Sequence, residues 1–98
     1  MEKFTPHWKL RVLKSMAGMR RVRMTRVARA GAVGLGFDFD GVLAVLLELR
    51  ATDFYKSMTS YADHLIWQDV YRPVTPLGQL YLNLTVVEDL PIVSFKEM

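Results

Sequence analysis

The spacing of hydrophobic residues along this chain changes from one half to the other. Up to about residue 50, apolar positions recur every three or four residues, as in helices that bury one face. After about residue 65 they alternate with polar positions, as in strands that bury one face. Helices followed by a run of strands predict an α+β fold, in which N-terminal helices pack on one face of a mainly antiparallel sheet.

The first predicted helix covers residues 7–17. Thr5 is a suitable N-cap, Pro6 is favoured at the first helical position, and Gly18 is typical of a helix end. On a helical wheel the segment has one apolar arc, made of Trp8, Val12, Leu13 and Met16. This arc is expected to face the core.

A short strand and two more helices are predicted before residue 50. Residues 22–24 form the strand, and Thr25 caps a helix that runs to about residue 32. The third helix covers residues 41–49, and its N-cap is either Asp38 or Asp40. Because this helix is apolar nearly all round, it should be the most buried of the three.

Three strands are predicted in the last third of the chain, over residues 65–72, 79–87 and 92–96. One face of the second strand is wholly apolar and consists of Leu80, Leu82, Leu84 and Val86. Its other face carries Tyr81, Asn83, Thr85 and Val87. The apolar face is expected to pack under the helices, which leaves the other face open.

The register of the last two strands follows if Asp89 and Leu90 form the hairpin loop. The predicted core pairs are then Leu84–Phe95 and Val86–Val93. The predicted pairs on the open side are Thr85–Ser94 and Asn83–Lys96. Tyr81 lies diagonally from Lys96, about 7–8 Å away, within reach of long side chains.

The preceding strand is harder to place, because the loop after it contains two prolines. If Gln68 shares the face of Tyr81 it can lie beside Tyr81, with Ile66, Val70 and Arg72 on the same face and Trp67 and Tyr71 on the other. A turn or helical stub from Asp53 leads into Lys56, which could reach this face from the edge of the helical layer. A polar sheet face is also common as a merely solvated surface.

Composition narrows the classes of protein to which the chain can belong. Ninety-eight residues, 51% of them apolar, suit one domain over residues 1–98 and exclude a disordered chain. The absence of cysteine excludes disulfides and thiolate chemistry. The longest apolar run, residues 42–47, is far shorter than the roughly 20 residues of a membrane span. We therefore expect a cytoplasmic protein without membrane contact.

The formal charge of +3 hides a strong asymmetry. Residues 1–36 contain nine Lys or Arg against Glu2 alone, whereas residues 37–98 contain four against nine Asp or Glu. The first third therefore carries +8 and the remainder −5. Such a basic segment attracts nucleic acid, or equally an acidic protein partner. It also resembles an organellar transit peptide, but its removal would leave little helix to cover the sheet.

Residues 53–73 gather the side chains most suited to binding RNA, namely Tyr55, Lys56, Tyr61, His64, Trp67, Gln68, Tyr71 and Arg72. Cations and hydroxyls hold a phosphodiester backbone, and rings stack on bases. Asp38 and Asp40 are explained by helix capping, and no third acidic residue lies at metal-ligand spacing. We therefore expect no metal and no other cofactor.

This segment, DFYKSMTSYADHLIWQDVYRP, resembles the motility/quorum-sensing regulator (MqsR-type) toxins of bacterial toxin–antitoxin systems, which are RelE-like endoribonucleases. The likeness extends to the opening MEK-x-TPH, to GFDFDG at residues 36–41 and to IVSFKE at residues 92–97. It is weakest over residues 10–34. Because the chain departs from the family at residues 20–23 and 29–32, the positions of the family's basic surface are difficult to assign in this sequence.

The resemblance implies a RelE-like fold and a metal-independent, ribosome-independent mRNA interferase, in which the 2′-hydroxyl of RNA attacks its own phosphate. By matching position it implies four catalytic residues, Lys56, Gln68, Tyr81 and Lys96. The lysines would bind the phosphate, Tyr81 would transfer a proton or donate to the phosphate, and Gln68 would orient the substrate. His64, Arg72 and Asn83 are further candidates for RNA binding.

The general base is left open. A lysine can act as a base near neutral pH only if its pKa is depressed, whereas histidine titrates there without help. Lys56 and His64 are therefore the two candidates.

The resemblance also implies a cognate antitoxin with a zinc-binding region and a helix-turn-helix region, and promoter DNA bound only through the toxin–antitoxin complex. The alternatives are a non-catalytic nucleic-acid-binding transcriptional regulator and a protein-interaction module that adds a strand to an exposed sheet edge.

Overall fold

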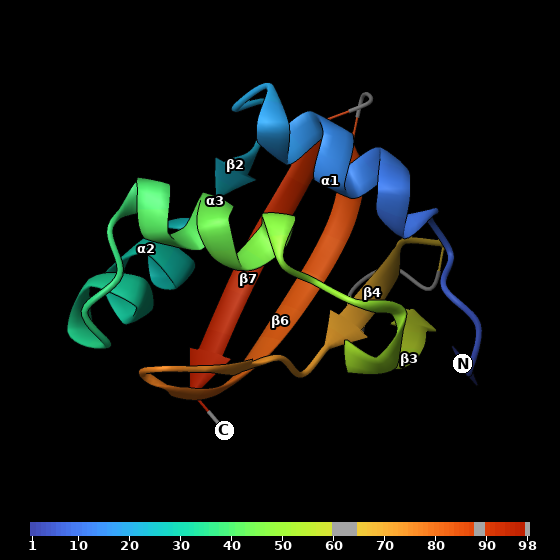
Figure 1. The fold of residues 1–98 in the computed structure, drawn as a ribbon. Coiled ribbons are helices and arrows are strands. Elements are labelled where there is room, and N and C mark those ends of the chain that lie inside the picture. The colour runs from blue at the N-terminus through green and yellow to red at the C-terminus, as the bar shows by residue number, and fades with distance from the viewer. Residues whose placement is uncertain (60–64, 88–89, 98) are drawn as a thin grey trace.

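The computed structural model describes residues 1–59, 65–87 and 90–97 (Figure 1). Its helices are α1 (Leu10–Gly18), α2 (Arg26–Gly34) and α3 (Phe39–Leu47), followed by a 3-10 turn, η1 (Ala51–Asp53). Its strands are β1 (Glu2–Lys3), β2 (Arg23–Met24), β3 (Phe54–Thr59), β4 (Trp67–Tyr71), β5 (Val74–Thr75), β6 (Gly78–Val87) and β7 (Leu90–Glu97).

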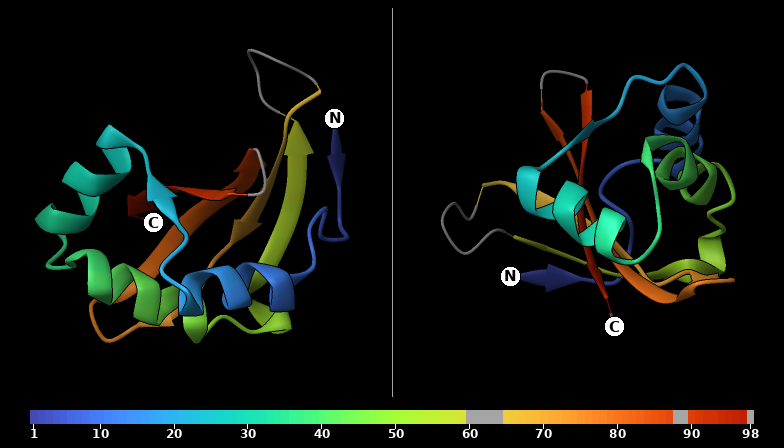
Figure 2. Two further views of the ribbon diagram at one scale, coloured as in Figure 1. Left: turned by 90° about the horizontal axis from the view of Figure 1, so that it is seen from above. Right: turned by 90° about the vertical axis from the view of Figure 1, so that its left-hand side faces the viewer.

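The strands form one sheet in the order β1-β3-β4-β6-β7-β2, with β5 paired to β6 off this path. Every pairing is antiparallel except that of β2 with β7. The three helices lie on one side of the sheet (Figure 1), and β1 and α2 lie near its opposite ends (Figure 2). The predicted α+β architecture is confirmed.

The core lies between the helices and one face of the sheet. From β6 it takes Leu80, Leu82 and Leu84, each at most 1% exposed, which confirms the predicted apolar face. Four residues of α3 are buried but only two in each of the other helices, so α3 is the most buried helix, as predicted. Among the described residues no single helix is long and apolar enough to cross a bilayer, and α2 with α3 approaches that length only across a 93° bend.

Two helix starts agree with the capping signals in the sequence. The side-chain oxygens of Thr25 and Asp38 each accept a hydrogen bond from the backbone N–H three residues later, at 3.0 and 2.7 Å. Such bonds satisfy donors that have no partner inside the helix. Asp40, the other candidate cap of α3, instead forms an ion pair with Arg20.

The predicted start of the first helix is wrong. α1 begins at Leu10, because the backbone N–H groups of His7 and Trp8 donate to the carboxylate of Asp69 in β4. These bonds hold His7 and Trp8 against the sheet, so the helix begins only after them. The apolar arc is also partly wrong, since Val12 is 46% exposed.

The predicted register of the last hairpin is wrong by two residues. Val87 pairs with Leu90, and Tyr81 pairs directly with Lys96. The neighbouring pairs are Leu82–Phe95, Asn83–Ser94, Leu84–Val93, Thr85–Ile92 and Val86–Pro91. Because side chains alternate with a period of two, a shift of two leaves every residue of β6 on its predicted face.

Three strands were not predicted, and two predicted strands, β2 and β4, are shorter than expected. β1 and β5 have only two residues each, too few for a visible alternation. β3 occupies the segment where a turn or stub leading into Lys56 was expected, so Lys56 belongs to the sheet and not to the edge of the helical layer. β4 covers five residues of the eight predicted.

Candidate active site on the open sheet face

The side of the sheet turned away from the core leucines carries the predicted site residues. Ladder pairs place these residues together, since Lys56 is opposite Val70, Met58 is opposite Gln68, and Val70 is opposite Asn83. Tyr81 continues the same side of β6, and Lys96 of β7 takes the ladder position opposite it. We call this surface the open face and define it by Lys56, Met58, Gln68, Val70, Tyr81, Asn83 and ladder position 96.

Two contacts join predicted residues across the open face. The Nδ2 group of Asn83 donates to Oε1 of Gln68 at 3.3 Å, so Gln68 lies beside Asn83 and not, as the sequence suggested, beside Tyr81. The Tyr81 phenol lies near enough to Lys56 to contribute to the raised pKa of its ammonium group. His64 is outside the described residues, so its relation to the open face stays a prediction.

Lys56 is bound to an acidic residue from the far end of the chain. Its Nζ donates to both carboxylate oxygens of Glu2 at 3.0 Å, which joins β3 to β1. The hydrogen bond from Glu2 is the main cause that raises the pKa of Lys56 above its ordinary value of 10.5, against the opposite effect of partial desolvation. Lys56 is therefore a fixed cation near neutral pH, suited to holding a phosphate and unsuited to act as a general base.

Glu2 is a site residue that the sequence reading missed. A two-residue strand gives no periodicity, and its partner β3 lies more than fifty residues away. The sequence contains one indication that Glu2 has a specific role, since it is the lone acidic residue among the first 36.

A buried carboxylate holds β1 and the stretch after it in place. Asp69 is 0% exposed, and its oxygens accept from the N–H of His7 at 3.0 and 2.9 Å and from that of Trp8 at 3.0 Å. The N–H of Thr59 also donates to the carbonyl oxygen of Met1 at 3.0 Å. The position of the N-terminal strand next to β3 therefore depends on contacts from two strands of the sheet.

Tyr55, one of the side chains of residues 53–73 that suit RNA binding, lies next to two of the predicted site residues. The β3–β4 ladder shifts between Phe54 and Lys56, which leaves Tyr55 as the extra residue of a β-bulge. Tyr55 is 41% exposed, and the centroid of its ring lies 4.4 Å from the Arg72 guanidinium carbon and 5.3 Å from the Lys56 Nζ. These distances are within cation–π range. The predicted RNA contact Arg72 and the predicted catalytic Lys56 are thus connected through one exposed ring.

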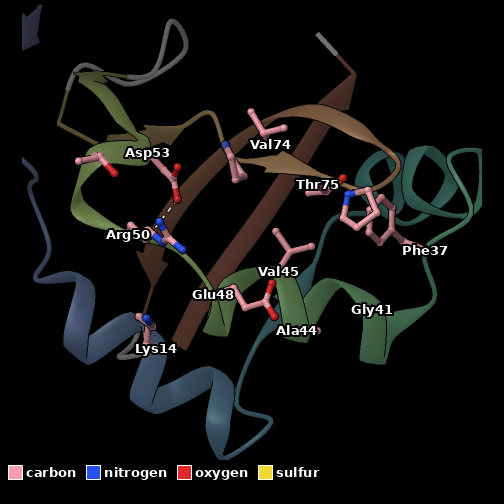
Figure 3. Close-up of a pocket in the computed structure, with 13 residues that line it drawn as sticks. Lys14, Phe37, Gly41, Ala44, Val45, Glu48, Arg50, Asp53, Val74 and Thr75 are labelled. Atoms are coloured by element: carbon pink, nitrogen blue, oxygen red, sulfur yellow. Dashed lines mark hydrogen bonds between the residues drawn. The ribbon is translucent and has the colours of Figure 1, made fainter.

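A cavity of about 900 Å³ lies elsewhere, bordered by α1, α3, η1 and the segment around β5 (Figure 3). Its charged lining residues are Lys14, Glu48, Arg50 and Asp53. Two of them have partners, since Lys14 Nζ donates to the carbonyl of Leu49 at 2.9 Å and Asp53 accepts from the backbone N–H of Arg50 at 2.9 Å. No predicted site residue whose side chain the structure describes lines this cavity, so the candidate site is the open face.

Among the described residues, neither the open face nor the cavity is a metal centre. In that part of the chain, no three His, Asp or Glu side chains lie close enough together to hold an ion. The groups gathered on the open face are instead a cation, a carboxylate, a phenol and two amides. Such a set can bind a phosphodiester and move protons to and from it.

Comparison with known proteins identifies relatives of this chain. The family described as "Motility quorum-sensing regulator, toxin of MqsA" matches residues 5–97. The mRNA interferase toxin MqsR of Escherichia coli (strain K12) is 55% identical to this chain over 97 residues, which cover 99% of each protein. The match includes the strands that carry the open face and the helices behind them. The chain belongs to the family of motility quorum-sensing regulator toxins.

Proposed function

We propose that this protein is an mRNA interferase, an endoribonuclease that cleaves mRNA and so inhibits translation. The observation that carries the proposal is the placement of Lys56, Gln68 and Tyr81 on one open face, with position 96 opposite Tyr81 in the ladder. The full-length similarity to a protein named as an mRNA interferase toxin supports it.

The proposed reaction needs neither metal nor ribosome. The 2′-hydroxyl of one nucleotide attacks the adjacent phosphate, and the product ends are a 2′,3′-cyclic phosphate and a 5′-hydroxyl. Lys56 and Lys96 stabilise the negative charge that develops on the phosphate oxygens, which is usually the largest contribution to catalysis. Tyr81 transfers a proton to the leaving oxygen, and Gln68, held by Asn83, orients the substrate.

Single-stranded RNA is the substrate that suits this surface. A sheet face presents groups in rows, where an extended strand can lay its backbone along cations and its bases on rings. Arg72, Asn83 and the exposed ring of Tyr55 border the proposed reaction centre and would hold the nucleotides next to the cleaved bond.

The family description names the protein as the toxin of an antitoxin, which supports a regulated role. We propose that this chain, as a single domain in the cytoplasm, is neutralised by a cognate antitoxin with a zinc-binding and a helix-turn-helix region. Promoter DNA would be bound only by the toxin–antitoxin complex. The basic first third provides a surface for RNA, for the antitoxin, or for both.

The test is incubation of the purified protein with a defined RNA in the presence of EDTA. We expect cleavage to 2′,3′-cyclic phosphate ends, and loss of most activity in Lys56→Ala and Tyr81→Phe. Arg50→Ala is the matched control, because Arg50 is an exposed cation outside both the open face and the basic first third. If the RNA stays intact but binds with a steep dependence on salt, the protein is a non-catalytic nucleic-acid-binding regulator.

A further inference from the structure

The proposed reaction requires a group that takes the proton of the attacking 2′-hydroxyl. Lys56 is protonated near neutral pH, as its contact with Glu2 shows. Amides do not titrate, so Gln68 and Asn83 are not bases, and Tyr81 already has the role of proton donor to the leaving oxygen. Among the described side chains, Glu2 is the carboxylate that contacts a predicted catalytic residue.

We propose that Glu2 is the general base of this ribonuclease. The proposal rests on the ribonuclease function argued above and adds to it a catalytic residue outside the four candidates. It assigns to the two-residue strand β1 a chemical role, where the fold alone would suggest only an edge strand.

The geometry allows Lys56 to hold Glu2 and a phosphate at once. An ammonium group has three donors, and both carboxylate oxygens of Glu2 lie 3.0 Å from Nζ. When a phosphate oxygen binds the same Nζ, the carboxylate lies next to the phosphate and therefore next to the 2′-hydroxyl that attacks it. A base must come within about 2.6–3.2 Å of the oxygen that loses its proton. The side chain of Glu2 is 44% exposed, so substrate can reach it.

The backbone of Glu2 is fixed well enough for such a role. Glu2 is opposite Met58 in the β1–β3 ladder, and Lys3 is opposite Ser57. The buried carboxylate of Asp69 anchors the chain five residues further on. A residue near a chain end is usually mobile, but here backbone hydrogen bonds and a buried anchor keep the carboxylate beside Lys56.

The step balances without any added oxidant, reductant or metal. Glu2 takes the proton from the 2′-hydroxyl while the 2′-oxygen forms a bond to phosphorus. The bond from phosphorus to the 5′-oxygen breaks, and the Tyr81 phenol gives its proton to that oxygen. Exchange with water then returns a proton to Tyr81 and removes one from Glu2. Lys56 stays positively charged throughout and stabilises the pentavalent transition state.

The charged surroundings of Glu2 determine which pH profile is expected. Lys56 from β3 contacts its carboxylate, and Tyr55 and Tyr81 lie near that ammonium. On the same strand, Lys3 contacts His7 and the ring of Trp67 instead. A general base acts only in its unprotonated form, so the proposal predicts a fall of kcat at acidic pH that depends on the carboxylate at position 2.

The test compares Glu2→Gln and Glu2→Asp with the unsubstituted protein in single-turnover cleavage of a defined RNA across a range of pH. We expect Glu2→Gln to lower kcat by about 10²- to 10⁴-fold, the usual contribution of a general base, with little change in KM. We also expect it to abolish the acidic limb of the pH profile, whereas Glu2→Asp should keep that limb and part of the rate. Asp40→Asn, which removes a carboxylate from the surface ion pair with Arg20, is the matched control and should behave like the unsubstituted protein.

Other results would overturn the assignment. Unchanged or faster cleavage by Glu2→Gln would mean that the carboxylate only occupies Lys56 until RNA displaces it. Glu2 would be only a structural contact if Glu2→Gln slowed the reaction but kept the acidic limb of the pH profile. The same would follow if Glu2→Gln lowered the melting temperature and raised KM. If His64→Gln, and not Glu2→Gln, abolished the acidic limb of the pH profile, His64 would be the general base. If the unsubstituted protein does not cleave RNA at all, the proposed function itself fails, which is a separate outcome.

Discussion

The carboxylate of Asp69 accepts the backbone N–H of His7 through both of its oxygens, at 3.0 and 2.9 Å, although 62 positions separate the two residues. Asp69 lies on the helix side of β4, so this contact passes from the interior of the protein to its N-terminal stretch. It thereby connects the packing of the core to the strand that carries Glu2 and hence to the surroundings of Lys56.

Asp69→Ala should therefore both destabilise the fold and weaken catalysis. It would leave the part-buried N–H groups of His7 and Trp8 without their acceptor, and we expect a loss of roughly 2–4 kcal/mol in the free energy of unfolding. Urea unfolding measures this loss, with Asp40→Asn as the exposed control, for which the change should be under about 1 kcal/mol. Equal effects of the two substitutions would contradict the anchoring role of Asp69.

Tyr71 should make the stability of the fold sensitive to high pH. Burial, and to a smaller extent Asp69, raise the pKa of its phenol from 10.0 to about 12, and no hydrogen-bond partner for the hydroxyl is found among the described residues. The folded state therefore prefers the protonated phenol. Stability is at its full value below pH 10 and falls between pH 10 and pH 12, at roughly 1.4 kcal/mol per pH unit.

Tyr71→Phe isolates this effect. The substitution removes an unpaired buried hydroxyl but keeps the ring, so at neutral pH the free energy of unfolding should be unchanged or slightly higher. Above pH 10 the variant should lose less stability than the unsubstituted protein, as measured by chemical unfolding at a series of pH values. A parallel loss in both proteins would show that this phenol is not the group responsible.

Tyr55→Ala should weaken RNA binding without unfolding the protein. The ring is exposed at a bulge beside Arg72 and Lys56, and stacking of a base on an aromatic side chain contributes about 1–3 kcal/mol. We expect an affinity about 5- to 100-fold lower for a 2′-O-methyl oligonucleotide, which cannot be cleaved. Tyr55→Phe keeps the stacking surface and should bind nearly as well as the unsubstituted protein. Equal weakening in both variants would point to the hydroxyl instead of the ring.

Lys96→Gln should lower cleavage but leave the melting temperature unchanged. Its ladder position opposite Tyr81 assigns it to the open face, where loss of a cation removes charge stabilisation of the phosphate. Leu82→Ala, at a core position of the same hairpin with 0% exposure, should do the reverse and cost roughly 2–5 kcal/mol of stability. A drop in melting temperature for Lys96→Gln like that of Leu82→Ala would show that the register argument is wrong.

Much of the fold could be predicted from short-range signals. Thr25 is predicted as a cap, and Asp38 as one of two candidates, because a cap involves groups only three positions apart. The core face of β6 was recognised because its leucines alternate with polar residues, and that alternation survived an error of two positions in the register. The α+β class followed from the same periodicities. These features depend on neighbours in the chain, so the sequence contains the whole signal.

The composition of the open face could be predicted only in part. The resemblance named Lys56, Gln68, Tyr81 and Lys96, and the strands place three of these side chains and the backbone position of the fourth on one side. The sequence could not show that Lys56 belongs to a strand, that its pKa is raised, or that Glu2 is the cause. The first depends on the β3–β4 pairing, and the other two depend on the β1–β3 pairing, whose partners are more than fifty positions apart.

The chain alone thus determined its helix caps, its buried sheet face and the kinds of chemical group available for a site. Tertiary structure alone decided which groups meet, through the β1–β3 pairing, the bulge at Tyr55 and the Asp69 anchor. The physical reason is the separation along the chain between the groups that interact. Caps and alternation result from contacts within a few residues, whereas the electrostatic partner of a side chain depends on which distant backbone segment the core brings beside it.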